Sequence, residues 1–317
     1  MAYQTGSASG CAAVLQALAT FAAAHGWTVN NNASYSGGWW LAVHNGGGCY
    51  LNFVTPAAGT DDYITIYGAT GFSVGAGPSG QAQTSAGFQF TAQAGPYSAY
   101  HFFSSSSGTY LHCLVEISSG MFAHFHGGQL NAVGGASPVI YVTTSRWYAY
   151  GPTYSGDLTS NSADYYYNIK PFSADGSAYS SGAVACTVDS TFRWFPMWSG
   201  TQPGRIAALG IGQSSSLLYG WQRSGFLATP NRYNGVAALF TIPFFLERAI
   251  GNTFSLVGEA PDVRYVNMTN NNAKDEITIG TDVWKLFPMV ANVPNGTGTP
   301  NGPASSYPFG LAFKKSA

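Results

Sequence analysis

The fold of this protein is decided by residues 110–126, which read YLHCLVEISSGMFAHFH. Two mostly apolar runs, residues 110–117 and 121–126, flank the short turn Ser118-Ser119-Gly120. Apolar runs of this length on either side of a Gly-containing turn are typical of an antiparallel β-hairpin. We therefore predict a mainly β protein built from antiparallel sheets in a sandwich-like or jelly-roll-like arrangement.

The same alternation of strand and turn recurs along the chain. The sequences WWLAVH at 39–44 and CYLNFV at 49–54 flank Asn45-Gly46-Gly47-Gly48, which predicts a second hairpin. YITIY at residues 63–67 has the period of two that a strand requires. Further strands are predicted at residues 139–143, 183–188, 206–209, 216–222, 236–242, 254–256, 263–268, 276–279 and 283–288.

One helix is predicted near the N-terminus, over residues 9–25. Val14 begins a series of apolar side chains at helical spacing, and alanines with high helix propensity fill the positions between them. Ser7 or Ser9 is expected to cap the helix, and Gly26 is expected to end it. We expect its apolar stripe to pack within its own domain, with docking into a neighbour as the alternative.

We expect the chain to be organised in three segments. Residues 1–30 form an N-terminal segment with the helix, and residues 31–290 form a β-rich body. This body can divide into two subdomains near residues 135–160. Residues 291–317 are expected to form an extended C-terminal arm.

The C-terminal arm ends in an apolar, aromatic segment. Residues 292–306 are rich in Pro, Gly and Asn and predict no regular structure. Tyr307, Phe309 and Phe313 follow, and such side chains are not typical of a solvated tail. We therefore expect the tip of the arm to dock on its own body or on a neighbouring molecule.

The composition is that of a protein whose surface is covered by other molecules. Only 8% of its 317 residues are charged, against about 25% in an average soluble domain. Aromatic residues make up 15%, which excludes intrinsic disorder. The net charge of -1 and the scattered basic residues are untypical of a nucleic-acid-binding protein. We predict a homo-oligomer that binds no nucleic acid.

The cysteines and the N-terminus bear on where the protein resides. Cys11, Cys49, Cys113 and Cys186 lie far apart and form no C-x-x-C motif, so we expect buried free thiols. The N-terminus lacks the basic region of a signal peptide, and no run of about 18 apolar residues predicts membrane insertion. We therefore expect the protein to be made in the cytoplasm of its host cell without a signal peptide.

Three histidines form the one constellation that suggests a metal. His124 and His126 lie two residues apart, so a strand would place both imidazoles on one side. His112, on the paired strand, could supply a third ligand. The interpretation that we favour is that these are polar residues on a solvated or interface face. We therefore predict no metal site and no cofactor.

Several aromatic residues are candidates for contacts with a partner or a glycan. Exposed aromatic rings can stack on sugars, whereas buried ones stabilise cores and interfaces. We favour burial. The candidates are Trp39, Trp40, Trp194, Trp198, Tyr307, Phe309 and Phe313.

The motifs that would indicate an enzyme lack their structural context. Residues 71–75 match the G-x-S-x-G nucleophile elbow, but the following Gly- and Pro-rich sequence predicts no helix. Residues 75–80 match G-x-G-x-x-G and fail as a dinucleotide site for the same reason. Most of the acidic residues lie in turn-like contexts and single out no glycosidase pair. We therefore predict no catalytic residue and no enzymatic activity.

Parts of the chain resemble a known class of proteins. They are similar to virion structural proteins encoded in the tail modules of tailed bacteriophages and prophages. The resemblance lies in Met1-Ala2-Tyr3-Gln4-Thr5-Gly6, in the hairpin of residues 110–126 with Gly127-Gly128 after it, and in residues 262–267, 276–280, 284–288 and 307–315.

The resemblance implies a multi-copy particle component in the virion and carries no catalytic residue. It implies a tail, baseplate or short tail-fibre protein that contacts other virion proteins and can contact the host surface. By analogy with tail-tip proteins we expect a trimer or a multiple of three. A head decoration or neck and collar protein is the first alternative, and a glycan-binding or glycan-degrading receptor protein is the second.

Overall fold

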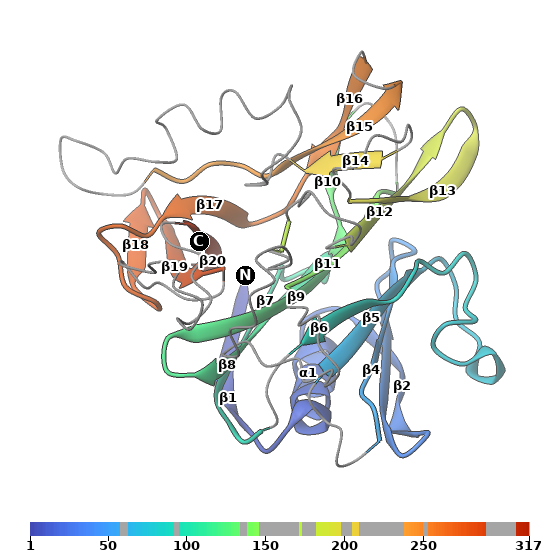
Figure 1. Ribbon diagram of the computed structural model, residues 1–317, viewed down its shortest axis with the longest axis horizontal. Helices are drawn as coiled ribbons and strands as arrows, with labels where there is room; N and C mark the ends of the chain where they lie inside the picture. Colours follow the sequence, from blue (N-terminus) through green and yellow to red (C-terminus); the bar gives the residue numbers. More distant parts are fainter. Residues whose placement is uncertain are drawn as a thin grey trace, which may run out of the picture.

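The computed structural model describes residues 1–57, 63–91, 95–133, 138–145, 171–172, 182–197, 205–208, 238–249, 253–289 and 309–316. Within these ranges the chain forms one α-helix and four antiparallel sheets (Figure 1). The prediction of a mainly β protein with antiparallel sheets and one N-terminal helix is confirmed.

A seven-stranded sheet occupies the centre of the molecule, in the order β1-β7-β8-β9-β11-β12-β13. In Figure 1 it lies between the remaining sheets. Its strands are β1 (Ala2–Ala8), β7 (Tyr97–Ser104), β8 (Tyr110–Ser118), β9 (Met121–Gln129), β11 (Ile140–Thr144), β12 (Gly182–Val188) and β13 (Thr191–Pro196).

The predicted hairpin of residues 110–126 is the β8–β9 pair of this sheet, in which His112 lies opposite His126. Every residue from Tyr110 to Ile117 in β8, and from Met121 to Gly128 in β9, is buried. Burial on both faces explains why these strands are almost continuously apolar instead of alternating with polar residues.

One face of the central sheet packs against α1 (Cys11–Ala24) and a five-stranded sheet. We call it the apolar face, because Leu111, Cys113, Val115 and Phe125 point into this core. The five strands, in the order β2-β3-β4-β5-β6, are β2 (Thr28–Tyr35), β3 (Gly38–His44), β4 (Tyr50–Val54), β5 (Tyr63–Ala69) and β6 (Phe88–Thr91).

The helix buries its apolar stripe within the protein, as predicted, with Val14 and Leu18 fully buried. The predicted cap is wrong, because Gly10 precedes the first turn and no side chain bonds to it. Ser7 belongs to β1, and Ser9 lies between the end of β1 and Gly10 without forming a capping hydrogen bond. Gly26, with a φ of +84°, ends the helix as expected.

The opposite face of the central sheet is covered by two four-stranded sheets, which share one core with it. The first has the order β10-β16-β15-β14, with β10 (Asn131–Ala132), β14 (Arg205–Ala208), β15 (Pro243–Ala249) and β16 (Thr253–Glu259). The second has the order β17-β20-β19-β18, with β17 (Val263–Asn267), β18 (Glu276–Ile279), β19 (Asp282–Pro288) and β20 (Phe309–Ser316).

The C-terminal segment docks on the protein's own body. Strand β20 pairs with both β17 and β19, and the Phe313 side chain is fully buried against the central sheet. Of the two docking partners that the sequence left open for this segment, its own body is the one used by residues 309–316. Most of the predicted arm, residues 291–308, lies outside the described residues.

Some strands differ from the sequence prediction. Residues 238–242 form no strand and contribute a single bridge between Phe240 and Tyr265, while residues 216–222 lie outside the described residues. Strands β1, β2 and β7 were not predicted, because Gly, Ser and Asn interrupt their apolar pattern. The central sheet also takes strands from both sides of residues 135–160, where a subdomain boundary was expected.

Candidate functional site

The second face of the central sheet carries a group of histidines, and we call it the histidine face. His112 on β8 and His126 on β9 are register partners, with ring centroids 5.2 Å apart. The His124 ring lies 5.5 Å from that of His126. The prediction that these three imidazoles share one side of the hairpin is confirmed. All three are fully buried, so the expectation of a solvated face is wrong.

A fourth histidine, His101, belongs to the same face. It lies on β7, where it pairs with Leu114, and its side chain is 3% exposed. Four of the six histidines of the chain therefore meet in one core. Sequence reasoning missed His101 because β7 was not predicted. The aromatic run Tyr100-His101-Phe102-Phe103 in that strand was the available signal.

Two of these imidazoles are tied to backbone carbonyls of the covering chain. The Nε2 atom of His112 donates a hydrogen bond to Pro261 O at 2.8 Å, and that of His124 donates to Pro288 O at 3.0 Å. A carbonyl can only accept, so each Nε2 carries the proton and each Nδ1 is an unprotonated lone pair. Both Nδ1 atoms are buried and have no hydrogen-bond partner among the described residues.

His126 makes no hydrogen bond through either nitrogen within the described part of the chain. Its ring stacks on Phe172 instead, with centroids 4.8 Å apart and planes 21° apart. The centroid of the Phe313 ring, from β20, lies 5.5 Å from that of His126. The imidazole is thus held by aromatic packing in a fully buried position.

Burial keeps all four imidazoles neutral near pH 7. Desolvation lowers the pKa of His112 and of His124 to about 3, against an ordinary value of 6.5. It lowers the pKa of His101 to about 4, and that of His126 well below its ordinary value. The four imidazoles are therefore uncharged at neutral pH, and protonating them at low pH destabilises the folded state.

Nowhere in the described ranges does a group of three or more His, Cys, Asp or Glu side chains have positions that could hold a metal ion. The hydrogen bonds from His112 and His124 to backbone carbonyls leave each Nδ1 lone pair unprotonated, so the positions of the rings and not their protonation state are what differ from a metal site. The hairpin brings the three histidines together, and their rings make packing contacts with one another and with Phe172.

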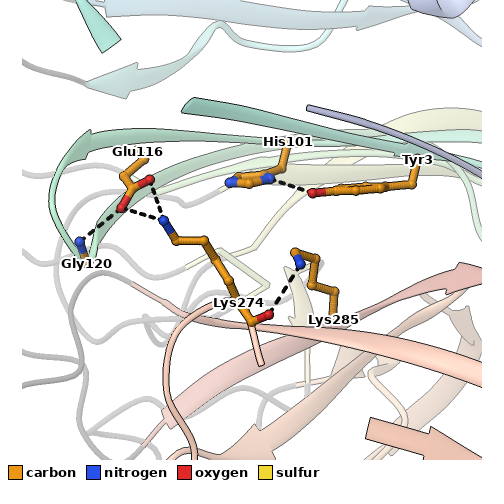
Figure 2. A network of polar contacts seen from close by, with 6 residues as sticks. All are labelled: Tyr3, His101, Glu116, Gly120, Lys274 and Lys285. Carbon is orange, nitrogen blue, oxygen red and sulfur yellow. Dashed lines mark hydrogen bonds and ion pairs between the residues drawn. The ribbon is translucent and has the colours of Figure 1, made fainter. Parts of the chain in front are cut away.

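A polar network closes the rim of the histidine face, where the β17–β20 sheet meets the central sheet (Figure 2). Glu116, whose side chain is 6% exposed, accepts hydrogen bonds from Lys274 Nζ at 2.8 and 3.0 Å and from the Gly120 amide at 3.1 Å. Tyr3 and His101 share a hydrogen bond of 2.9 Å. Lys285 Nζ lies 5.7 Å from the centre of the Tyr3 ring.

The aromatic candidates separate into three groups. Trp40 is 4% exposed and Phe313 is fully buried, so burial is confirmed for these two. Trp39 and Trp194 are partly buried and pack against the core of the apolar face. Trp198, Tyr307 and the side chain of Phe309 lie outside the described residues.

The G-x-S-x-G segment forms no nucleophile elbow. Residues 71–75 belong to the loop between β5 and β6, which contains only a 3-10 turn, Val74–Ala76. The four cysteines are buried thiols that form no disulfide, as predicted. Burial raises the pKa of the Cys49 and Cys113 thiols, so both remain protonated and unreactive near neutral pH.

Comparison with known proteins adds no assignment. No protein-family model matches the chain, and no curated protein is significantly similar to it in sequence. In the part of the chain that the structure describes, no helix is long and apolar enough to cross a membrane.

Proposed function

We propose that this protein is a structural component of a bacteriophage particle, in the tail, baseplate or a short tail fibre, where it assembles as a homo-oligomer. The observation that carries the proposal is the distribution of charge. The first 145 residues contain no Lys or Arg, and their only acidic residues are Asp61, Asp62 and Glu116. This stretch includes α1, the whole five-stranded sheet and five strands of the central sheet.

Such a surface suits permanent contacts between molecules. Glu116 is buried, so within residues 1–57, 63–91, 95–133 and 138–145 no Asp, Glu, Lys or Arg side chain projects into solvent. Proteins that remain free in solution rely on charge to prevent association. Interfaces are depleted in charged residues and enriched in aromatic ones, and obligate interfaces are the largest. The resemblance to tail-module proteins supports the same class of protein.

The histidine face fits a structural role rather than a chemical one. Its imidazoles are neutral, packed between three sheets and closed at the rim by the Glu116–Lys274 pair. A group that acts on a substrate must be able to reach it. These side chains contribute instead to holding the β17–β20 sheet on the central sheet, as a particle component under mechanical load requires.

A glycan-binding receptor protein is the second candidate. Tyr35 is 37% exposed, and its ring lies 5.5 Å from that of Trp40, which in turn lies 5.7 Å from Phe72. Aromatic rings on an uncharged surface are suited to stacking on sugars. A glycan array tests this alternative, and binding that is lost in Tyr35→Ala would favour it.

Antibody labelling of purified particles in electron micrographs tests the proposal directly. We expect label on the tail or baseplate. Label confined to the head or neck would replace the tail assignment with the head-decoration alternative, and absence from purified particles would overturn the proposal. The mass of the purified protein in solution tests assembly separately, because a stable trimer or multiple of three is expected.

A further inference from the structure

The edges of the four sheets differ in how well they are protected against pairing with another strand. An edge strand exposes unpaired backbone N–H and C=O groups, and proteins protect such edges with charge, proline or very short strands. Most edges here have one of these features. They are Arg193 and Pro196 in β13, Arg205 in β14, Arg264 in β17, Glu276 in β18, the two residues of β10 and the four residues of β6.

Among the longer edge strands, two contain neither charge nor proline, and cationic side chains lie over one of these two. Lys285 and Lys315 place their ammonium groups 5.7 and 5.5 Å from the centre of the Tyr3 ring in β1. The other is β2, the eight-residue edge of the five-stranded sheet, whose sequence is TVNNNASY. It lies at the end of that sheet away from β6 (Figure 1).

Strand β2 is accessible where its pairing is regular. Its register with β3 shifts between Val29 and Asn31 and is regular from Asn31 to Tyr35. Asn32, Ala33, Ser34 and Tyr35 are all exposed. Its side chains are uncharged, so a second copy of the same strand would meet no repulsion.

We infer that β2 pairs antiparallel with β2 of a second copy of this chain, joining two five-stranded sheets into one. This inference rests on the proposed homo-oligomer and names one of its contacts. A two-fold axis perpendicular to the sheet keeps each residue on the same face in both copies. The axis therefore lies midway between the two copies of one residue, which pair with each other. Ala33 is at the centre of the regular part of β2, so we place the axis between the two copies of Ala33.

This register gives compatible neighbours. Ala33 meets Ala33, which is small enough for close approach on the axis. Asn32 meets Ser34, and amide and hydroxyl side chains opposite each other can form hydrogen bonds. Combined with a three-fold contact elsewhere on the surface, the two-fold pairing produces a hexamer, a multiple of three.

The first test places charge on the edge. The double variant Asn32→Lys/Ser34→Lys introduces four lysines at the paired strands, and Ser106→Lys/Ser119→Lys adds the same charge at exposed turns outside β2. Sedimentation of the full chain should show a two-fold loss of mass, with a dissociation constant raised at least about tenfold, only for the β2 variant. A monomeric wild type, or an unchanged β2 variant, would overturn the inference.

The second test fixes the register. The four native cysteines are buried, so an introduced thiol at Ala33→Cys is the reactive one. Directly opposed residues have Cα atoms about 4.5 to 5.5 Å apart, within the range that a disulfide requires. Mild oxidation should give a covalent dimer, whereas Ser106→Cys should not. No cross-link would overturn the axis at Ala33. A lysine variant with the same oligomer mass as the wild type would refute the pairing while leaving the particle role intact.

Discussion

The two faces of the central sheet are built from the same strands and differ in chemistry. On the apolar face, Leu111, Cys113, Val115 and Phe125 pack against α1 and the five-stranded sheet. On the histidine face, the alternate residues of the same strands place imidazoles and Glu116 in a core of equal burial. One face therefore depends on packing alone, and the other depends on packing plus the protonation state of its polar groups.

The two faces differ in the free-energy cost of burying their side chains. Buried apolar side chains need no partners, whereas each buried imidazole must remain neutral and leaves nitrogen atoms unpaired. The two faces should accordingly respond differently to pH and to substitution. Four predictions test that contrast.

Acid should have the largest effect and should act through the histidine face. An unfolded imidazole takes up a proton near pH 6.5, whereas the folded His112 and His124 do so only near pH 3. The unfolded state binds more protons between these values, so stability is complete above about pH 6.5 and is lost as the pH falls. At pH 5 each of these two imidazoles costs about 2 kcal/mol relative to pH 7.

Urea unfolding at pH 7, 6 and 5 measures this loss. His101, with a folded pKa of about 4, should add a similar amount at pH 5. We expect the midpoint to fall steadily over this interval. A midpoint that is constant from pH 7 to pH 5 would contradict the burial of neutral imidazoles.

Truncation on the apolar face should cost slightly less and should not depend on pH. Phe125 is fully buried, with the rings of Phe90 and Phe53 at 5.0 and 5.8 Å. Phe125→Ala should therefore lose roughly 3 to 5 kcal/mol of unfolding free energy. The loss should be the same at pH 7 and pH 6. Phe125→Leu should lose less unfolding free energy than Phe125→Ala, because its larger side chain leaves a smaller cavity. A loss that grew with acidity would show that the two faces do not behave independently.

Breaking the rim of the histidine face should cost about 2 kcal/mol. Glu116→Gln removes the charge that Lys274 binds while an amide oxygen can still accept from Gly120. The matched control is Glu276→Gln, an exposed carboxylate between Lys285 and Lys315, for which we expect less than about 1 kcal/mol. Thermal unfolding of both variants measures the two losses of unfolding free energy. Equal losses would show that the buried Glu116–Lys274 pair stabilises the protein no more than an exposed ion pair does.

The smallest effect at neutral pH is expected for His126→Leu. Its nitrogen atoms have no partner among the described residues, so an apolar side chain of similar size should change stability by less than about 1.5 kcal/mol. One proton fewer should be taken up on acid unfolding, which makes the pH dependence shallower. His112→Leu should cost more, because it strands the Pro261 carbonyl. A larger loss of stability in His126→Leu than in His112→Leu would mean that the His126 imidazole makes a stabilising polar interaction.

The sequence was sufficient for the local elements that have a strong pattern. The β8–β9 hairpin, the β3–β4 hairpin and α1 were all predicted, because periodicity and turn residues act over a few positions. Edge strands such as β2 were missed, since their side chains face solvent and carry no apolar signal. The grouping of His112, His124 and His126 followed from the hairpin, but its burial did not.

The sequence by itself determined that this protein is mainly β, poor in charge and supplied with four buried thiols. Only the tertiary structure decided that the histidines are interior, because that depends on β17 to β20, more than 130 residues further along the chain, covering them. It also decided that His101 and Tyr3 belong to the same face and that β2 is an edge strand of the five-stranded sheet among the described residues. A strand pattern fixes which residues share a side, whereas what covers that side is fixed by contacts between distant segments.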